Sequence, residues 1–190
     1  MYTLESLERY CLNCNRCPLH TTRTNVVFGE GNPKATIMFI GEGPGFNEDK
    51  QGRPFVGAAG HLFDRMLNAI ELKREDVYIA NIVKCRPPNN RNPLTEETRV
   101  CIEYLRWQVK LINPKIIVCL GAVSAQNIIS RDFKITKDRG IWVELGNFYV
   151  MPTYHPAALL RDENKKRPAW EDFKNIKRKY EELQSAIYYE

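Results

Sequence analysis

The sequence predicts an α/β fold built around a mainly parallel β-sheet. Four short apolar segments have the composition of strands, and the first three are almost continuously apolar, as expected of parallel strands buried on both faces. Segments with helical periodicity separate them, which is the pattern of repeated β-α-β units. The expected strands are Ala35 to Ile40, Val77 to Val83, Ile116 to Leu120 and Phe148 to Thr153.

The helices are predicted from apolar residues that recur every three or four positions. His61 to Ile70 and Thr95 to Ile112 both have this pattern, and Thr95 is the expected N-cap of the second helix. Ala122 to Ser130 is expected to form a shorter helix. Near the end of the chain a stripe at helical spacing is expected to pack in the core, and it comprises Trp170, Phe173, Ile176, Tyr180 and Leu183.

Length and composition favour one domain. The chain has 190 residues, of which 43% are hydrophobic and 27% are charged, enough for one well-buried core. We therefore expect residues 1–190 to form a single domain.

A β-hairpin is expected over Gly140 to Val150, with its turn at Gly146-Asn147, because this dipeptide suits a turn with positive φ.

Composition also narrows the class of protein. No segment approaches the roughly 18 consecutive apolar residues of a membrane helix, and residues 1–6 lack the basic-then-apolar order of an export signal. We expect a cytoplasmic, intracellular protein that is not secreted and has no membrane partner. The net charge of +5 is compatible with a polyanionic partner. The basic run from Arg161 to Lys179 fits either a nucleic-acid patch or a solvated helix face.

Four cysteines have the arrangement of a soft-metal site assembled from distant segments. Cys14 and Cys17 form a C-x-x-C pair, which lets one tight turn offer two sulfurs to one centre. Cys85 and Cys101 can complete the shell. In a reducing compartment such cysteines favour metal or core roles over disulfides. These residue types fit either a four-thiolate zinc or a [4Fe–4S] cluster.

The other two cysteines need separate explanations. Cys11 forms an overlapping C-x-x-C pair with Cys14, so either outer cysteine of the run could be the spare, and we favour Cys14 and Cys17 as the ligands. Cys119 lies inside an apolar run and is expected to be a small buried core residue.

Glycine-rich and polar segments follow each predicted strand. Ligand sites of parallel α/β sheets gather at the carboxyl ends of the strands, so these segments are the expected site. A glycine-rich turn lets backbone N–H groups approach a ligand, although the first of these turns matches neither a Walker A motif nor a dinucleotide fingerprint. The segments are Gly41 to Gly45, Gly52 to Gly57, Asn81 with Lys84 to Pro93, Gly121 to Ser124, and Tyr154 to Arg161.

Taken together, five motifs resemble family 4 of the uracil-DNA glycosylase superfamily, its iron–sulfur-containing branch. They span most of the chain and are Cys14 to Cys17, Gly41 to Gly45, Gly52 to Gly57, Asn81 to Pro88 and His155 to Arg161. The resemblance implies a three-layer α/β/α sandwich with a short, mainly parallel central sheet. It also implies a [4Fe–4S] cluster on Cys14, Cys17, Cys85 and Cys101. The implied activity is hydrolysis of the N-glycosidic bond of deoxyuridine in DNA, which releases uracil and starts base-excision repair.

The residue types fit recognition of an extruded uracil. Phe55 is suited to stack on the ring, and the Asn81 side chain can accept from N3–H while donating to O4. Cytosine presents the opposite pattern. Backbone N–H groups of the Glu42-Gly43 turn, together with a neutral His155, can stabilise the charge that develops on O2 of the leaving uracil.

The sequence offers two carboxylates as partners of the attacking water. The best-known members of the superfamily carry a carboxylate at the third position of the first motif, and this chain has Gly43 there. Glu42 and Glu48 are the candidates for orienting or activating the water. Glu48 could alternatively crowd the position of a thymine methyl group.

DNA contacts are expected from two of the loops. The resemblance implies a minor-groove wedge in which Leu159 or Leu160 fills the gap left by the extruded base, while Arg161 approaches a phosphate. The proline- and asparagine-rich segment with Arg86 and Arg91 is expected to contact the DNA backbone, with an ordinary surface loop as the alternative.

Two other classes of function fit part of the sequence. A non-catalytic nucleic-acid-binding module with a four-cysteine metal site explains the sulfurs and the basic tail, and an electron carrier explains the cysteine run. Neither explains Phe55, Asn81 and His155 at strand ends. We expect a monomer that acts on uracil-containing DNA, double- or single-stranded. Nothing in the sequence assigns a protein partner such as a sliding clamp.

Overall fold

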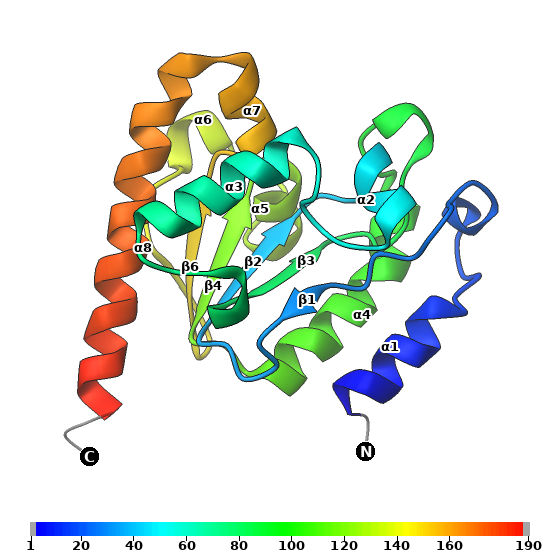
Figure 1. Cartoon of the computed structure of the whole chain (residues 1–190), viewed down its shortest axis with the longest axis horizontal. Coiled ribbons are helices and arrows are strands. Elements are labelled where there is room, and N and C mark those ends of the chain that lie inside the picture. Colours follow the sequence, from blue (N-terminus) through cyan, green and yellow to red (C-terminus); the bar gives the residue numbers. More distant parts are fainter. Residues whose placement is uncertain (1–2, 188–190) are drawn as a thin grey trace.

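A six-stranded sheet forms the centre of the computed structural model, which describes residues 3–187 (Figure 1). Its spatial order is β1-β3-β2-β4-β6-β5, with the inner four strands parallel and the two edge strands antiparallel to their neighbours. The mainly parallel α/β sheet predicted from the sequence is thus confirmed. The strands are β1 (Glu30–Gly31), β2 (Ile37–Gly41), β3 (Tyr78–Asn81), β4 (Ile116–Leu120), β5 (Val143–Leu145) and β6 (Phe148–Thr153).

Helices cover both faces of the sheet and make three layers (Figure 1). Successive residues of a strand face opposite sides, so in β2 Met38 and Ile40 enter one core while Ile37 and Phe39 enter the other. The first core contains residues of α1 (Leu4–Leu12), α4 (Thr95–Ile112) and α5 (Ala122–Ile128). The second contains residues of α3 (Ala58–Ala69) and α8 (Lys166–Ile187).

Short elements lie in the connections, several of them near the carboxyl ends of the strands. The short α-helices are α2 (Phe46–Gln51), α6 (Ile135–Asp138) and α7 (Pro156–Arg161), and the 3-10 helices are η1 (Pro18–Thr21), η2 (Arg74–Asp76), η3 (Pro88–Asn90) and η4 (Glu163–Lys165). Within residues 3–187, no helix combines the length and apolar character needed to cross a bilayer.

Most predicted elements are present with shifted bounds, and two details were wrong. The hairpin is confirmed, with Gly146 at φ 58° between β5 and β6. The N-cap of α4 is Leu94 instead of Thr95, because the Glu97 carboxylate accepts from the Leu94 N–H at 2.7 Å. The stripe on α8 packs in the core except for Trp170, which is 37% exposed.

Candidate active site

A pocket of about 600 Å³ opens at the carboxyl ends of the parallel strands. Each of the four strands contributes to its lining, through Glu42 after β2, Asn81 at the end of β3, Gly121 after β4 and His155 after β6. These residues are far apart in the sequence, and the parallel register brings them together. The polar segments after the strands therefore line one pocket, as the parallel sheet predicted.

The Asn81 side chain is aimed into this pocket without a partner. It is 2% exposed, and its Oδ1 atom accepts no hydrogen bond from any described residue. Gly41 lies opposite it on β2, and a Cβ there would stand 2.4 Å from Asn81 Oδ1 and 2.7 Å from Phe55 Cζ. A buried, unsatisfied acceptor costs about 1–3 kcal/mol, so its presence marks a place where a ligand can donate.

Phe55 is held in a strained backbone conformation beside Asn81. Its φ is 54°, in the left-handed region that bulky residues seldom adopt. Arg74 Nη1 donates to the Phe55 carbonyl at 2.8 Å, and Glu48 Oε1 accepts from the N–H groups of Val56 and Gly57 at 2.9 and 2.8 Å. These two side chains therefore hold the backbone at and just after Phe55. Arg74 was missed by sequence reasoning, since it stands in an ordinary polar run.

His155 is a neutral hydrogen-bond donor toward the pocket. Its Nδ1 accepts from the Ala157 N–H at 3.1 Å at the N-terminus of α7, so the proton of the neutral ring is on Nε2. Burial of the ring and the nearby positive charge of Arg161 lower its pKa to about 4, against the opposing effect of Glu48. The ring lies against that of Phe55, with centroids 5.5 Å apart and planes at 30°.

Glu42 and Glu48 both line the pocket but differ in their contacts. Glu48 is engaged by the two backbone N–H groups of the Phe55 loop. The Glu42 carboxylate makes no hydrogen bond within residues 3–187. Burial raises the pKa of Glu42, and Arg161 opposes that effect. Of the two carboxylates proposed from the sequence, Glu42 has both oxygens free of hydrogen bonds to described residues, whereas Oε1 of Glu48 is already engaged.

The two leucines of the predicted wedge have opposite environments. Leu160 is 47% exposed on α7, whereas Leu159 is 2% exposed and packs inside the protein. The expectation that Leu159 could serve as the exposed wedge is corrected, because adjacent residues of a helix face different sides. Arg161 ends α7, is exposed and lines the pocket.

Arg86 and Arg91 brace the segment between β3 and α4. Arg86 Nε donates to Asn90 Oδ1 at 2.7 Å, and Arg91 makes a bidentate pair with the buried carboxylate of Glu97 at 2.7 and 2.9 Å. Both guanidinium groups thus have partners inside the protein. Their expected contacts with DNA phosphates stay a prediction.

Five cysteines line one small cavity away from this pocket. They come from three distant segments and are Cys11, Cys14, Cys17, Cys85 and Cys101. The donors around the cavity suit thiolates, since Arg23 Nη1 donates to Cys85 Sγ at 3.3 Å and the Lys84 N–H donates to Cys101 Sγ at 3.2 Å. Within residues 3–187, no group of three or more His, Cys, Asp or Glu side chains is placed as the ligands of a single metal ion.

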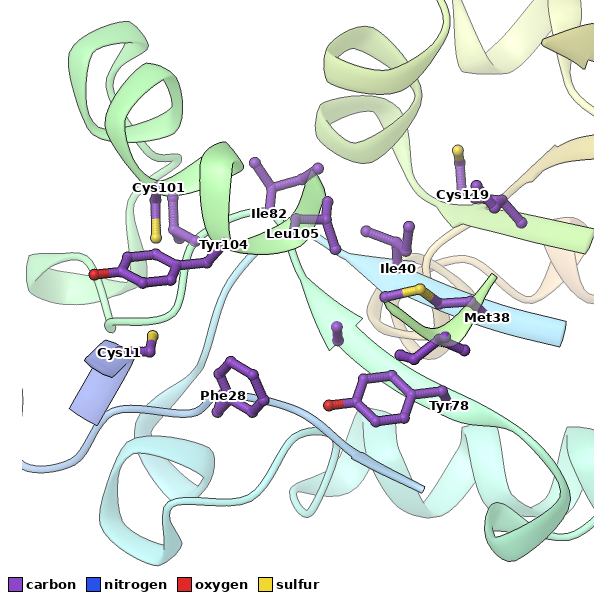
Figure 2. Close-up of a cluster of buried hydrophobic side chains, with 14 of the residues drawn as sticks. Cys11, Phe28, Met38, Ile40, Tyr78, Ile82, Cys101, Tyr104, Leu105 and Cys119 are labelled. Atoms are coloured by element: carbon purple, nitrogen blue, oxygen red, sulfur yellow. The ribbon is translucent and has the colours of Figure 1, made fainter. Parts of the chain in front are cut away.

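The sixth cysteine has the predicted core role. Cys119 is fully buried in β4, and Figure 2 shows it at the far end of the hydrophobic cluster from Cys11 and Cys101. Burial raises the pKa of the Cys119 thiol to about 12. Cys11 is also 1% exposed and belongs to this cluster, unlike the half-buried Cys14 and Cys17.

Lys84 connects the cysteine cavity with the pocket, and sequence reasoning missed it. While its backbone N–H donates to Cys101, its buried Nζ donates to the Asn81 carbonyl at 2.9 Å and to Gln108 Oε1 at 2.6 Å. The only signal in the sequence is its position between the strand and Cys85. Burial lowers the pKa of Lys84 to about 8.

Comparisons with known proteins agree with this arrangement. Residues 28–174 match the family model described as the uracil DNA glycosylase superfamily. A type-4 uracil-DNA glycosylase of Sulfurisphaera tokodaii is 50% identical, over 93% of this chain and 84% of the relative. Those of Thermotoga maritima and Archaeoglobus fulgidus are 48% and 46% identical, over 93% of this chain and 96% and 92% of the relatives. This chain therefore belongs to the uracil-DNA glycosylase superfamily and, within it, to the type-4 branch.

Proposed function

We propose that this protein is a DNA repair glycosylase that extrudes deoxyuridine from DNA and hydrolyses its N-glycosidic bond. The products are free uracil and an abasic site, as in the first step of base-excision repair. The observation that carries the proposal is the convergence of Phe55, Asn81, His155 and Glu42 on one pocket. The names of the type-4 relatives support the same reaction.

Base recognition follows from the unpartnered amide of Asn81. Its Oδ1 accepts from uracil N3–H and its NH2 group donates to O4, so the buried acceptor gains the partner that it lacks in the free protein. The base stacks on Phe55, which contributes about 1–3 kcal/mol. A base between two rings needs about 7 Å, two van der Waals separations, so the imidazole of His155 must move off the Phe55 face when the base enters.

Cleavage leaves the electron pair of the glycosidic bond on uracil, with much of the charge on O2. The neutral Nε2–H of His155 donates to this oxygen, and backbone N–H groups of the Glu42-Gly43 turn can act in the same way. Glu42 holds the water that attacks the sugar carbon C1′ and takes up its proton. Glu48 positions the Phe55 loop instead of the water.

Extrusion of the base is assisted by α7. Leu160 is exposed and follows the pocket residues Ala157 and Ala158, so it can fill the space that the uridine leaves in the duplex. Unstacking costs a few kcal/mol, least for a mismatched base such as uracil opposite guanine. Arg161 is placed to meet a phosphate beside the extruded nucleotide.

The cysteine cavity is proposed to hold a [4Fe–4S] cluster on Cys14, Cys17, Cys85 and Cys101. The thiols at the cavity and the N–H donors aimed at two of their sulfurs fit such a group. When bound, the cluster ties the N-terminal segment to α4 and to the segment after β3. Cys11, which is almost fully buried, packs behind it as a neutral thiol because burial raises its pKa.

Two measurements test these assignments. Purified protein should release uracil from an oligonucleotide with one deoxyuridine, detected as alkali-labile strand scission, and should leave the matched deoxycytidine oligonucleotide intact. Failure to cleave would refute the glycosylase proposal.

The protein should also be brown, with broad visible absorption. Serine at Cys14, Cys17, Cys85 or Cys101 should bleach it, whereas Cys119→Ser should not. A colourless protein with stoichiometric zinc would overturn the iron assignment, and bleaching by Cys11→Ser but not by Cys17→Ser would overturn the choice of ligands.

A further inference from the structure

A second groove lies next to the active-site pocket. It has a volume of about 590 Å³ and is lined by residues of α4, of α5 and of the two segments that flank them. Asn92 and Val123 line both this groove and the pocket, so the two spaces are adjacent. We call it the α4–α5 groove.

The charge of the α4–α5 groove is entirely positive. Arg99, Arg106 and Arg131 line it, all three are exposed, and none of them forms an ion pair with any described residue. Arg99 and Arg106 are seven positions apart, so they lie on the same face of α4. Among the described residues no aspartate or glutamate lines the groove. A groove with charge of one sign attracts an oppositely charged ligand.

The unpaired arginines of the groove contrast with the cations of the basic run Arg161 to Lys179, which the sequence suggested as a possible nucleic-acid patch. Most lysines of that run are neutralised on α8 and the turn before it. The ion pairs are Lys165–Asp162, Lys166–Glu163, Lys174–Glu171, Lys177–Glu181 and Lys179–Glu182. The run is thus mainly a solvated helix face. Arg99, Arg106 and Arg131, which form no ion pair with any described residue, lie instead beside the pocket, where the sequence did not suggest a patch.

We propose that the α4–α5 groove binds the sugar–phosphate backbone of the substrate DNA next to the extruded nucleotide. The three guanidinium groups pair with successive phosphates, and neutral groups such as the Asn92 amide and the Ser130 hydroxyl can donate to phosphate oxygens. Because these contacts are independent of the base, they add affinity for DNA without adding selectivity for uracil. The inference rests on the proposed function for the identity of the ligand.

The salt dependence of DNA binding tests the groove. Each neutralised phosphate contributes about 0.9 to the slope of log K against log salt for duplex DNA. The triple variant Arg99→Gln, Arg106→Gln, Arg131→Gln should therefore lower the slope by about 2.7. Between 50 and 200 mM salt, wild-type protein should lose about 40-fold more affinity than the variant. The probe is a duplex with a stable abasic-site analogue, which cannot be cleaved.

A second triple variant controls for net charge. Arg9→Gln, Lys34→Gln and Lys115→Gln remove three exposed cations that form no ion pair with a described residue. Lys34 and Lys115 precede β2 and β4, at the end of the sheet opposite the pocket. This control should change the slope by less than 0.5, roughly half of one phosphate contact. Visible absorption and circular dichroism of both variants establish that they are folded.

The outcomes distinguish failure of the groove proposal from failure of the proposed glycosylase function. An unchanged slope in the groove variant, or an equal change in the control, would overturn the groove as a DNA site. The single-turnover rate of uracil release at saturating protein should stay within twofold in the groove variant, and a large loss would mean that these arginines act in the chemistry. If wild-type protein binds DNA through the groove but releases no uracil, the glycosylase proposal fails while the groove stands.

Discussion

Alanine at Gly41 should disable base recognition without disturbing the fold. Gly41 ends β2 in an ordinary strand conformation, so its backbone accepts an alanine. The added Cβ would stand 2.4 Å from Asn81 Oδ1 and 2.7 Å from Phe55 Cζ, whereas ordinary contact begins at 3.4 Å. The two side chains must therefore move by 1.0 Å (3.4 − 2.4) and 0.7 Å (3.4 − 2.7). A misplacement of about 1 Å costs on the order of 100-fold in rate, equivalent to about 2.7 kcal/mol.

The assay is single-turnover uracil release from a duplex at saturating protein, with binding to the abasic-site analogue measured in parallel. We expect Gly41→Ala to lower the rate about 100-fold while binding changes by less than about twofold, because the phosphate contacts lie elsewhere. Gly146→Ala is the control. Its Cβ meets nothing within 4 Å, and its φ of 58° makes the substitution strained, so it should cost stability without loss of rate. A near wild-type rate in Gly41→Ala would refute the roles of Asn81 and Phe55 in holding the base.

Three further predictions follow from the same site. Leu160→Ala should slow uracil release from duplex more than from single-stranded DNA, whereas Leu159→Ala should lower the unfolding free energy by about 2–5 kcal/mol and slow release from both substrates equally. Equal losses of rate on duplex and single-stranded DNA with Leu160→Ala would exclude a wedge. Asn81→Asp should lose most uracil activity and gain a trace on cytosine, because aspartate accepts from the N4 amine, and Asn81→Ala should show the loss alone; wild-type rates in both would exclude Asn81 as the reader. The pKa of His155 is about 4 against an ordinary 6.5, so its contribution to the free energy of unfolding is complete above pH 6.5 and declines by up to about 3 kcal/mol as the pH falls to 4. Unfolding free energies of wild type and His155→Gln measured across this range should converge at low pH, and parallel curves would contradict the shift.

The type of fold and the place of the site could be predicted from local patterns. Strands buried on both faces require continuous apolar residues, and Ile116 to Leu120 has only apolar residues for that reason. Parallel strands put their carboxyl ends at one edge, so Asn81 and His155 could be expected in the same pocket before any coordinates. The hairpin turn at Gly146 has an equally local cause.

Residues that act through distant partners could not be predicted. Arg74 holds the Phe55 carbonyl across 19 positions of sequence, and Lys84 links Asn81 with Gln108 inside the core. In the sequence Arg74 stands among charged residues and Lys84 follows an apolar strand, and neither position shows which groups the side chain meets in the fold. Their roles depend on which backbone and side-chain groups the fold brings to them.

The sequence by itself determined the α/β layering, the family, the candidate ligands of the cluster and the residues around the pocket, because periodicity and motif spacing are properties of short segments. Only the tertiary structure decided which leucine of α7 is exposed, which carboxylate is free, and which cations are unpaired. Leu159 and Leu160 are neighbours of the same type, and Glu42 and Glu48 are only six positions apart, yet burial and hydrogen bonding separate each pair. The lysines of α8 and the arginines of the α4–α5 groove carry the same charge, but among the described residues only the lysines form ion pairs with acids one helical turn away. Glu103, three positions before Arg106 on α4, pairs with Arg16 instead.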